Sequence, residues 1–278
     1  MKLDGKVVVI TGAGHGIGLG LATRFVEEGA AAVVVSDVDP DACAAAGEQL
    51  GQPHRPCDVG NPEGYAALLD WVEDDVGPID LLCNNPAVFG GPEGGNFQTT
   101  EATWEWSWQV NVMAHVRSAE QLVPRMLRRG GGYFLQTVSA AGLITSNSSL
   151  AYTVTKHAAI GFAEWLVLNY GDRGIGVSCL CPTAVETRPR QFADLPGIGL
   201  VQTPAEVADV TVQGLEDERF LILPNPAVGG SFRKKATDYD AWISRTIDRI
   251  APIKPTGPWD SEFPVPDPSE TFPTSRRQ

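Results

Sequence analysis

The chain has 278 residues, of which 43% are hydrophobic, and its formal net charge is −13. This composition can bury one large core, and the length suits a single α/β domain better than two separate ones. An acidic surface repels phosphate groups, so neither nucleic acids nor anionic membranes are expected partners.

The amino-terminal residues lead directly into a short apolar run and show no signal-peptide pattern. No run approaches the ~18 apolar residues that a membrane-spanning helix needs. The five cysteines have no zinc-binding spacing. Cys57, Cys83, Cys179 and Cys181 lie in or beside strand-like runs, so we expect buried free thiols, no metal site and a cytoplasmic protein.

Short β-branched runs alternate with helical patterns along the chain, which predicts a parallel sheet covered by crossover helices. Strands are expected at residues 6–10, 32–36, immediately before 58, 80–83, 132–138, 175–181 and 220–223. Helices are expected at residues 16–28, from 40 onward, 62–76, 101–129, 152–170 and from 204 to about 215, where capping residues or apolar periodicity mark them. The predicted fold is one doubly wound Rossmann domain of seven parallel strands with helices on both faces.

Three later segments depart from this alternation. Residues 183–202 have few periodic apolar positions, which suggests a mobile flap. Residues 239–250 carry apolar side chains at three- and four-residue steps, which predicts an amphipathic helix packed on the domain or on a neighbour. Residues 251–278 contain seven prolines, so we expect a catalytic domain over 1–250 followed by an extended tail.

The first expected strand is followed by Thr-Gly-Ala-Gly-His-Gly-Ile-Gly at residues 11–18. Glycines between a strand and a helix let the backbone approach a pyrophosphate and point N–H groups at it. Gly12, Gly16 and Gly18 are the key positions for this role. The motif indicates a dinucleotide site, with an ordinary glycine-rich turn as the alternative.

Asp37 ends the second expected strand, about 20 residues past the glycine loop. Its carboxylate can accept hydrogen bonds from a ribose diol and would repel a 2′-phosphate. The neighbouring positions, His15 and Val38, offer no lysine or arginine to bind that phosphate. These residues favour NAD over NADP, unless Asp37 serves only to cap the next helix.

Tyr152 and Lys156 are four residues apart, so they share one face of the predicted helix. A nearby cation favours a phenolate and makes tyrosine usable as an acid or base near neutral pH. Ser139 follows the fifth expected strand and could hydrogen-bond a carbonyl oxygen at the same sheet edge. Taken alone, the pair could equally be a half-buried tyrosine beside an extended lysine.

These positions together resemble the short-chain dehydrogenase/reductase family over about residues 5–225. The motifs arrive in the family's order. They are the glycine loop, Asp58-Val59, Asn84-Asn85, Asn111, Ser139, Tyr152 with Lys156, and Pro182 through Thr187.

The resemblance implies a role for each catalytic residue. Tyr152 would protonate or deprotonate the substrate oxygen, and Ser139 would hold that oxygen. Lys156 would lower the pKa of the tyrosine and bind the nicotinamide ribose, and Asn111 would position a water linking Lys156 to solvent. The residues implied in binding NAD are Gly12, His15, Gly16, Ile17, Gly18, Asp37, Asp58, Val59, Asn85, Ala87, Tyr152, Lys156, Val185 and Thr187.

The chain departs from the family pattern at two loops. Pro86 follows Asn85 where the family has alanine and then glycine, which removes a backbone N–H and stiffens the loop. Thr183 follows Pro182 where the family has glycine, which removes a permissive residue near the nicotinamide. Both departures concern the shape of the loops around the cofactor.

The sequence therefore predicts an NAD-dependent oxidoreductase acting on a secondary alcohol or ketone. Val88, Phe89, Ile144, Ser146, Ser149 and residues 188–202 are the expected pocket lining, and their mixed apolar character suggests a hydrophobic substrate. The family resemblance also implies a homodimer or homotetramer formed through the 101–129 and 151–170 helices. An epimerase or dehydratase on the same fold, or a nucleotide-sensing scaffold without turnover, are the alternatives.

Overall fold

The structure is a computed structural model that describes residues 1–89, 100–145, 149–186 and 201–251. Its centre is a six-stranded sheet in which all neighbouring strands are parallel, in the order β2-β1-β3-β4-β5-β6. The strands are β1 (Val7–Thr11), β2 (Ala32–Ser36), β3 (Leu81–Asn84), β4 (Gly132–Thr137), β5 (Ile175–Leu180) and β6 (Leu221–Ile222). This confirms the predicted Rossmann-type α/β fold.

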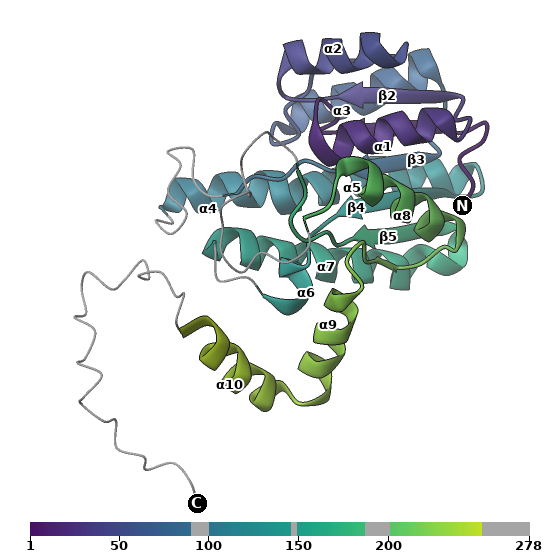
Figure 1. Cartoon of the computed structure of the whole chain (residues 1–278). Coiled ribbons are helices and arrows are strands. Elements are labelled where there is room, and N and C mark those ends of the chain that lie inside the picture. The colour runs from purple at the N-terminus through teal and green to yellow at the C-terminus, as the bar shows by residue number, and fades with distance from the viewer. Residues whose placement is uncertain (90–99, 146–148, 187–200, 252–278) are drawn as a thin grey trace, which may run out of the picture.

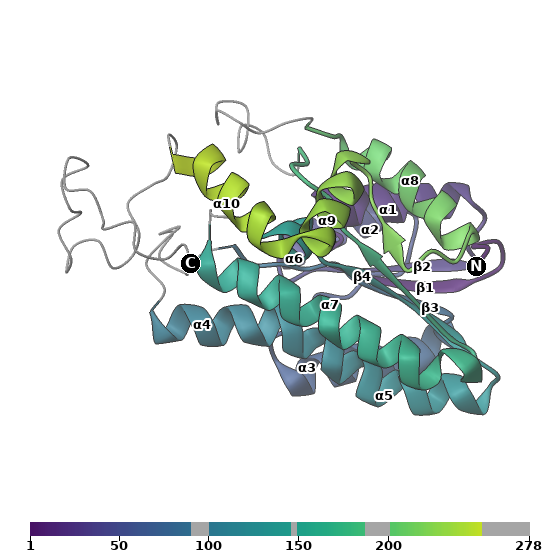
Figure 2. The ribbon, with the colours of Figure 1, turned by 90° about the horizontal axis from the view of Figure 1, so that it is seen from below.

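Helices cover both faces of this sheet (Figures 1 and 2). The helices that alternate with the strands are α1 (Gly16–Glu27), α2 (Pro40–Leu50), α3 (Pro62–Trp71), α4 (Glu101–Trp108), α5 (Ala114–Arg128), α6 (Ala141–Ile144), α7 (Leu150–Tyr170) and α8 (Pro204–Glu216). One core lies between the sheet and α1, α2 and α8, and a second lies between the sheet and α3, α5 and α7. The side chains of each strand alternate between these two cores, as the period of a strand requires.

The prediction of seven strands was wrong by one. The expected third strand, immediately before residue 58, runs beside β2 and exchanges backbone hydrogen bonds with Val35, but only His54 forms a bridge with it. Pro53 and Pro56 flank this position, and neither has a backbone N–H to donate to a ladder. The segment therefore lies at the sheet edge without becoming a strand.

The expected 101–129 helix is interrupted by a turn of π-helix at Gln109–Met113, between α4 and α5. A second π-helical turn, Val72–Val76, extends α3. A short 3-10 turn, Gly171–Arg173, follows α7. Because π-turns widen a helix and are common at functional sites, the turn that contains Asn111 marks a point of interest.

Two helices follow the last strand at its carboxyl end. The predicted amphipathic helix is α10 (Tyr239–Ile250), and it packs on α9 (Ala227–Thr237), which the sequence analysis did not predict. Figure 1 shows this pair projecting from the body of the domain below α6. Of the expected proline-rich tail, only Ala251 lies within the described residues.

All five cysteines are free thiols, and Cys57 is half-buried while the other four are buried. None of the described helices is long and apolar enough to cross a membrane.

Candidate active site

The carboxyl ends of the parallel strands meet at one edge of the sheet, and the loops that leave them bring the predicted site residues together. Strand order reverses at β1, which pairs with β2 on one side and with β3 on the other. In open α/β sheets, ligands bind in the crevice at such a reversal. The glycine loop leaves β1 at this crevice, and the Asn85–Pro86 turn leaves β3 beside it.

The glycine loop requires its glycines for two different reasons. Gly12 and Gly16 have φ angles of 63° and 57°, in the left-handed region that favours glycine. A Cβ on Gly18 would lie 2.1 Å from the carbonyl oxygen of Gly12, so only glycine lets α1 approach β1 this closely. Because these three positions carry no side chain, the backbone of the loop is left uncovered there.

The amino terminus of α1 is suited to an anion. Its N-cap residue His15 makes no side-chain capping bond, and its first turn contains no acidic residue. By contrast, side chains cap α2, α3 and α8 at Asp39, Asn61 and Thr203. The first N–H groups of α1, which have no partner within the helix, can donate to a pyrophosphate.

Asp37 supports this loop directly. Its carboxylate accepts hydrogen bonds from the backbone N–H of Gly14 at 2.8 Å and of Asp39 at 3.1 Å. The side chain is buried at the end of β2, where it faces the glycine loop, and Val38 beside it is 67% exposed. Asp37 thus fixes the glycine loop and also places a negative charge next to it.

The turn after β3 packs against the glycine loop. The side-chain amide of Asn85 donates to the carbonyl of Gly12 at 3.0 Å, and its carbonyl oxygen is buried without a partner among the described residues. A Cβ on Gly12 would lie 3.1 Å from the backbone of Pro86, so the proline lies directly against the glycine. Pro86 therefore packs against Gly12 at the junction of the two loops, and Ala87 follows it.

Asp58 and Val59 lie at the edge of the same crevice. The Asp58 side chain is exposed and accepts a hydrogen bond from the backbone N–H of Gly60 at 2.8 Å. Val59 is buried in the core. The backbone N–H of Cys57 donates to the carbonyl of Asp37, which ties this turn to the end of β2.

Tyr152 and Ser139 come together at the carboxyl end of β4. The Ser139 side chain lies near enough to Tyr152 to affect its pKa, and the Ser139 hydroxyl oxygen accepts the backbone N–H of Ala141 at 3.1 Å. Burial raises the pKa of Tyr152, and the interaction with Ser139 opposes that rise. The pKa of Tyr152 thus moves in the direction opposite to the one expected from its lysine neighbour.

Lys156 is completely buried beneath the tyrosine. Its ammonium lies 5.6 Å from the centroid of the Tyr152 ring and donates to the backbone carbonyl of Thr137 at 3.0 Å. Burial lowers the pKa of Lys156 to about 8. Desolvation favours the neutral form of both side chains, which is why the pKa of Tyr152 rises and that of Lys156 falls.

Asn111 holds a neighbouring loop in place. Its side-chain oxygen accepts the N–H of Val88 at 2.9 Å, and its amide donates to the carbonyl of the same residue at 3.0 Å. The amide also donates to the Thr155 hydroxyl at 3.1 Å. Asn111 therefore joins the Val88 loop to α7, between Tyr152 and Lys156, and its role toward a water stays a prediction.

Phe89 follows Val88 and contacts Tyr152. The ring centroids of Phe89 and Tyr152 lie 4.8 Å apart at an interplanar angle of 59°. The Phe89 side chain is 49% exposed, so it presents an apolar surface beside the Tyr152 ring. Ile144, at the end of α6, is half-buried, whereas Ser146 lies outside the described residues.

Val185 lies at the base of the expected flap. It is buried and forms a parallel bridge with Gln202, whose amide donates to the carbonyl of Pro224. The Thr183 hydroxyl oxygen is buried and has no hydrogen-bond partner in the described part of the chain. Thr187 and most of the flap lie outside the described residues.

A buried polar pair below the site was not predicted from the sequence. His115 bonds through its Nδ1 to the side-chain oxygen of Gln136, and burial together with the charge of Lys156 lowers the pKa of His115 to about 4. The only signal in the sequence was that His115 follows Asn111 by four residues, which places both on one helix face. Nothing in that spacing indicates Gln136, which comes from β4.

The site thus combines a backbone cradle for a dinucleotide with a hydroxyl pair, Ser139 and Tyr152, above a buried lysine. The glycine positions, the uncapped start of α1 and the unpartnered oxygen of Asn85 all fit a bound dinucleotide. These features define a nucleotide-dependent α/β enzyme.

Comparison with known proteins identifies the family. Residues 6–194 match the short chain dehydrogenase family. The 1-deoxy-11-beta-hydroxypentalenate dehydrogenase of Streptomyces exfoliatus is 31% identical over 277 residues, covering 96% of this chain and 97% of its own. Cyclohexanol dehydrogenase of an Acinetobacter species is 28% identical over 246 residues, covering 84% of this chain and 97% of its own.

A solved structure shows the same relationship. The short chain dehydrogenase/reductase of Burkholderia phymatum, in complex with NAD, aligns with a TM-score of 0.75 and 29% identity, over 87% of this chain and 96% of its own. The chain belongs to the short-chain dehydrogenase/reductase family and is an oxidoreductase of that family.

Proposed function

We propose that the protein transfers a hydride between NAD(H) and the carbinol or carbonyl carbon of a hydrophobic secondary alcohol or ketone. The observation that carries this proposal is the joint placement of Ser139, Tyr152 and Lys156 beside the dinucleotide cradle. The named substrates of two relatives, cyclohexanol and 1-deoxy-11-beta-hydroxypentalenate, support an alicyclic hydroxyl compound.

When bound, the nicotinamide ring supplies or accepts the hydride. The chain's own residues manage the oxygen of the substrate and its proton. In the oxidation direction, Tyr152 takes the hydroxyl proton while Ser139 holds the oxygen, and in the reduction direction Tyr152 returns the proton to it. The protonated Lys156 favours the deprotonated tyrosine by its charge, and its position against Thr137 keeps that charge close.

The apolar surface of Phe89 supports the choice of substrate. An exposed aromatic ring 4.8 Å from the Tyr152 ring would contact whatever group flanks the reacting carbon. Asn111 holds the backbone of the preceding residue, Val88, through two hydrogen bonds. A rigid apolar wall favours a bulky hydrophobic alcohol over a small polar one.

The preference for NAD rests on Asp37. A negative charge next to the glycine loop disfavours a 2′-phosphate, and its two backbone hydrogen bonds prevent the carboxylate from turning away. The five free cysteines support the expectation of a reducing compartment, the cytoplasm.

A panel of secondary alcohols with NAD tests the proposal. We expect steady NADH production from at least one alicyclic alcohol, and Tyr152→Phe should reduce kcat by roughly 100-fold or more while NADH still binds. Ser139→Ala should lower kcat less, since the tyrosine hydroxyl remains.

The two alternatives give different results in the same assay. A nucleotide-sensing scaffold would bind NADH with no turnover on any alcohol or ketone. An epimerase or dehydratase would convert its substrate without net NADH production. The intact Ser139, Tyr152 and Lys156 favour the dehydrogenase.

A further inference from the structure

Lys235 on α9 is a buried cation outside the catalytic group. Its side chain is only 7% exposed, although α9 and α10 carry many exposed charges. The ammonium donates to the backbone carbonyl of Leu143 at 2.8 Å and lies 3.5 Å from Nε2 of His157. No carboxylate within the described ranges forms an ion pair with it.

Two aromatic rings of α10 complete the surroundings of this ammonium. It lies 5.5 Å from the centroid of the Tyr239 ring and 5.1 Å from that of Trp242. Both distances are in the range of cation–π attraction. One ammonium therefore joins four helices: α9, which carries it, and α6, α7 and α10, which it contacts.

The contact with α6 lies next to the catalytic serine. Leu143 is in the last turn of α6, where backbone carbonyls have no donor within the helix, so Lys235 supplies one. The other end of α6 is held by the Ser139 hydroxyl, which accepts the N–H of Ala141. Immediately after α6, Thr145 has a φ of 61°, a strained conformation for a β-branched residue that persists only where its surroundings hold it.

The contact with α7 lies next to the catalytic lysine. His157 follows Lys156, and its Nδ1 lies 2.9 Å from the carbonyl of Thr153. If Nδ1 carries the proton and donates to that carbonyl, Nε2 presents its lone pair to the Lys235 ammonium. A neutral imidazole of this tautomer attracts the cation, whereas a protonated one would repel it.

An apolar side chain would fill this space at lower cost, because burying an unpaired charge is expensive. What the ammonium adds is direction: it must point at one carbonyl and between two rings. The effect expected of such a group is on geometry more than on stability.

We propose that Lys235 is a positioning residue that holds the α9–α10 pair against α6 and α7 and so sets the shape of the substrate side of the active site. The inference rests on the proposed dehydrogenase function. The topology agrees with it, because α9 follows β6 and α6 follows β4 at the same carboxyl edge of the sheet.

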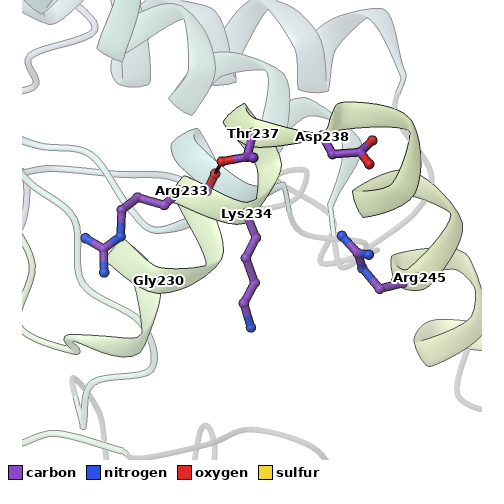
Figure 3. A pocket seen from close by; sticks show the side chains of 6 residues that line it. All are labelled: Gly230, Arg233, Lys234, Thr237, Asp238 and Arg245. Atoms are coloured by element: carbon purple, nitrogen blue, oxygen red, sulfur yellow. Dashed lines mark hydrogen bonds between the residues drawn. The ribbon is translucent and has the colours of Figure 1, made fainter.

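The adjacent Lys234 provides a matched control. Figure 3 shows its side chain at the pocket between α9 and α10, which has a volume of about 410 Å³ and is also lined by Arg233 and Arg245. Lys234 is exposed and carries the same charge on the same helix as Lys235. A change at Lys234 therefore removes a lysine from α9 without disturbing the contacts of Lys235.

The test compares Lys235→Met with Lys234→Met, using the best alcohol of the panel. For Lys235→Met we expect KM to rise about tenfold or more with the Kd for NADH changed less than about twofold, and for Lys234→Met no change in either. Lys235→Arg, which keeps the charge and donors, should recover part of the loss. Equal KM values for the two methionine variants would overturn the proposal.

Hydrogen exchange gives a second readout that needs no substrate. In Lys235→Met the amides of residues 141–144 and 239–250 should exchange faster than in Lys234→Met, while those of α1 should not. If no alcohol is turned over, this result still decides the role of Lys235 separately from the proposed function. If Lys235→Met does not fold, Trp242→Leu can be used instead, because it removes one of the two aromatic rings that contact the ammonium. Unchanged hydrogen exchange in residues 141–144 of that variant would count against the proposal.

Discussion

The ammonium of Lys156 lies 5.6 Å from the centroid of the Tyr152 ring, and its hydrogen bond goes to the carbonyl of Thr137. The lysine is therefore positioned by β4, and it acts on the tyrosine through space. Desolvation shifts the half-buried Tyr152 and the buried Lys156 toward their neutral forms, and the cost of keeping Lys156 charged falls on the folded state.

Lys156→Met should abolish turnover and stabilise the fold at neutral pH. Burial lowers the pKa of Lys156 from 10.5 to about 8, which corresponds to about 3 kcal/mol of cost below pH 8. In the native protein this cost disappears as the pH rises from 8 to 10.5, because the unfolded lysine then also becomes neutral. Denaturant unfolding should give the variant a higher free energy of unfolding than the native protein at pH 7, and this difference should be smaller at pH 10.5. A variant less stable than the native protein at pH 7 would contradict this.

His115 should contribute to acid unfolding. Its pKa falls from 6.5 to about 4 in the folded state, so the unfolded chain binds the proton more readily between these values. The native protein should lose up to about 3 kcal/mol of unfolding free energy as the pH falls from 6.5 to 4. The His115→Asn variant should lose less unfolding free energy over the same pH range. Subtracting its curve of unfolding free energy against pH from that of the native protein removes the shared effect of the carboxylates. Parallel curves would show that His115 does not titrate as its burial indicates.

Asp37 should determine the choice of cofactor. We expect kcat/KM with NAD to exceed that with NADP by roughly 100-fold, about 2.7 kcal/mol. Asp37→Asn removes the charge but leaves an oxygen that can accept the Gly14 N–H, so it should narrow the ratio with little loss of NAD affinity. Asp37→Ala should narrow the ratio and also weaken NAD, because the glycine loop loses its support. Equal kcat/KM values with NAD and NADP in the native protein would show that Asp37 does not determine the choice of cofactor.

The chain should form a dimer or tetramer through α4 and α7. Exposed apolar side chains gather on these two adjacent helices, namely Trp106, Trp108, Val154, Trp165 and Leu168. Trp165→Glu should shift the mass in light scattering toward the monomer, since a buried unpaired carboxylate is costly. Val210→Glu, an exposed apolar position on α8 at the opposite face of the sheet, serves as the control. A monomeric native protein at micromolar concentration would rule out this assembly.

The carboxyl-terminal tail should act on the assembly or on the substrate site. Its sequence carries Ile253, Trp259, Phe263, Val265 and Phe272 among the prolines, and α10 ends beside it with Ile243 and Ile247 exposed. Deleting residues 251–278 should change the oligomeric mass, the Tm or the KM. Replacing the two phenylalanines and Trp259 by serine keeps the length and separates apolar contact from chain length. If all three quantities stay the same in the deletion variant, the tail has no part in either.

Much of the site could be predicted because its signals are local. Gly12, Gly16 and Gly18 follow a strand at the spacing that a tight turn from a strand into a helix requires. Tyr152 and Lys156 are four residues apart, so the helical period alone places them on one face. The capping box at Thr203 and Glu206 likewise determined where α8 begins, since both partners are three residues apart. Each of these depends on a few neighbouring residues.

What only the tertiary structure decided depends on residues far apart in the chain. The expected third strand did not form because Pro53 and Pro56 have no backbone N–H to donate to β2. Burial of Tyr152 by surrounding elements reversed the direction of its pKa shift. Nothing in the sequence distinguishes Lys235 from the adjacent Lys234, and packing places Lys235 between α6, α7 and α10. Local periodicity encodes helices and strands, but desolvation and contacts between elements arise only once they pack together.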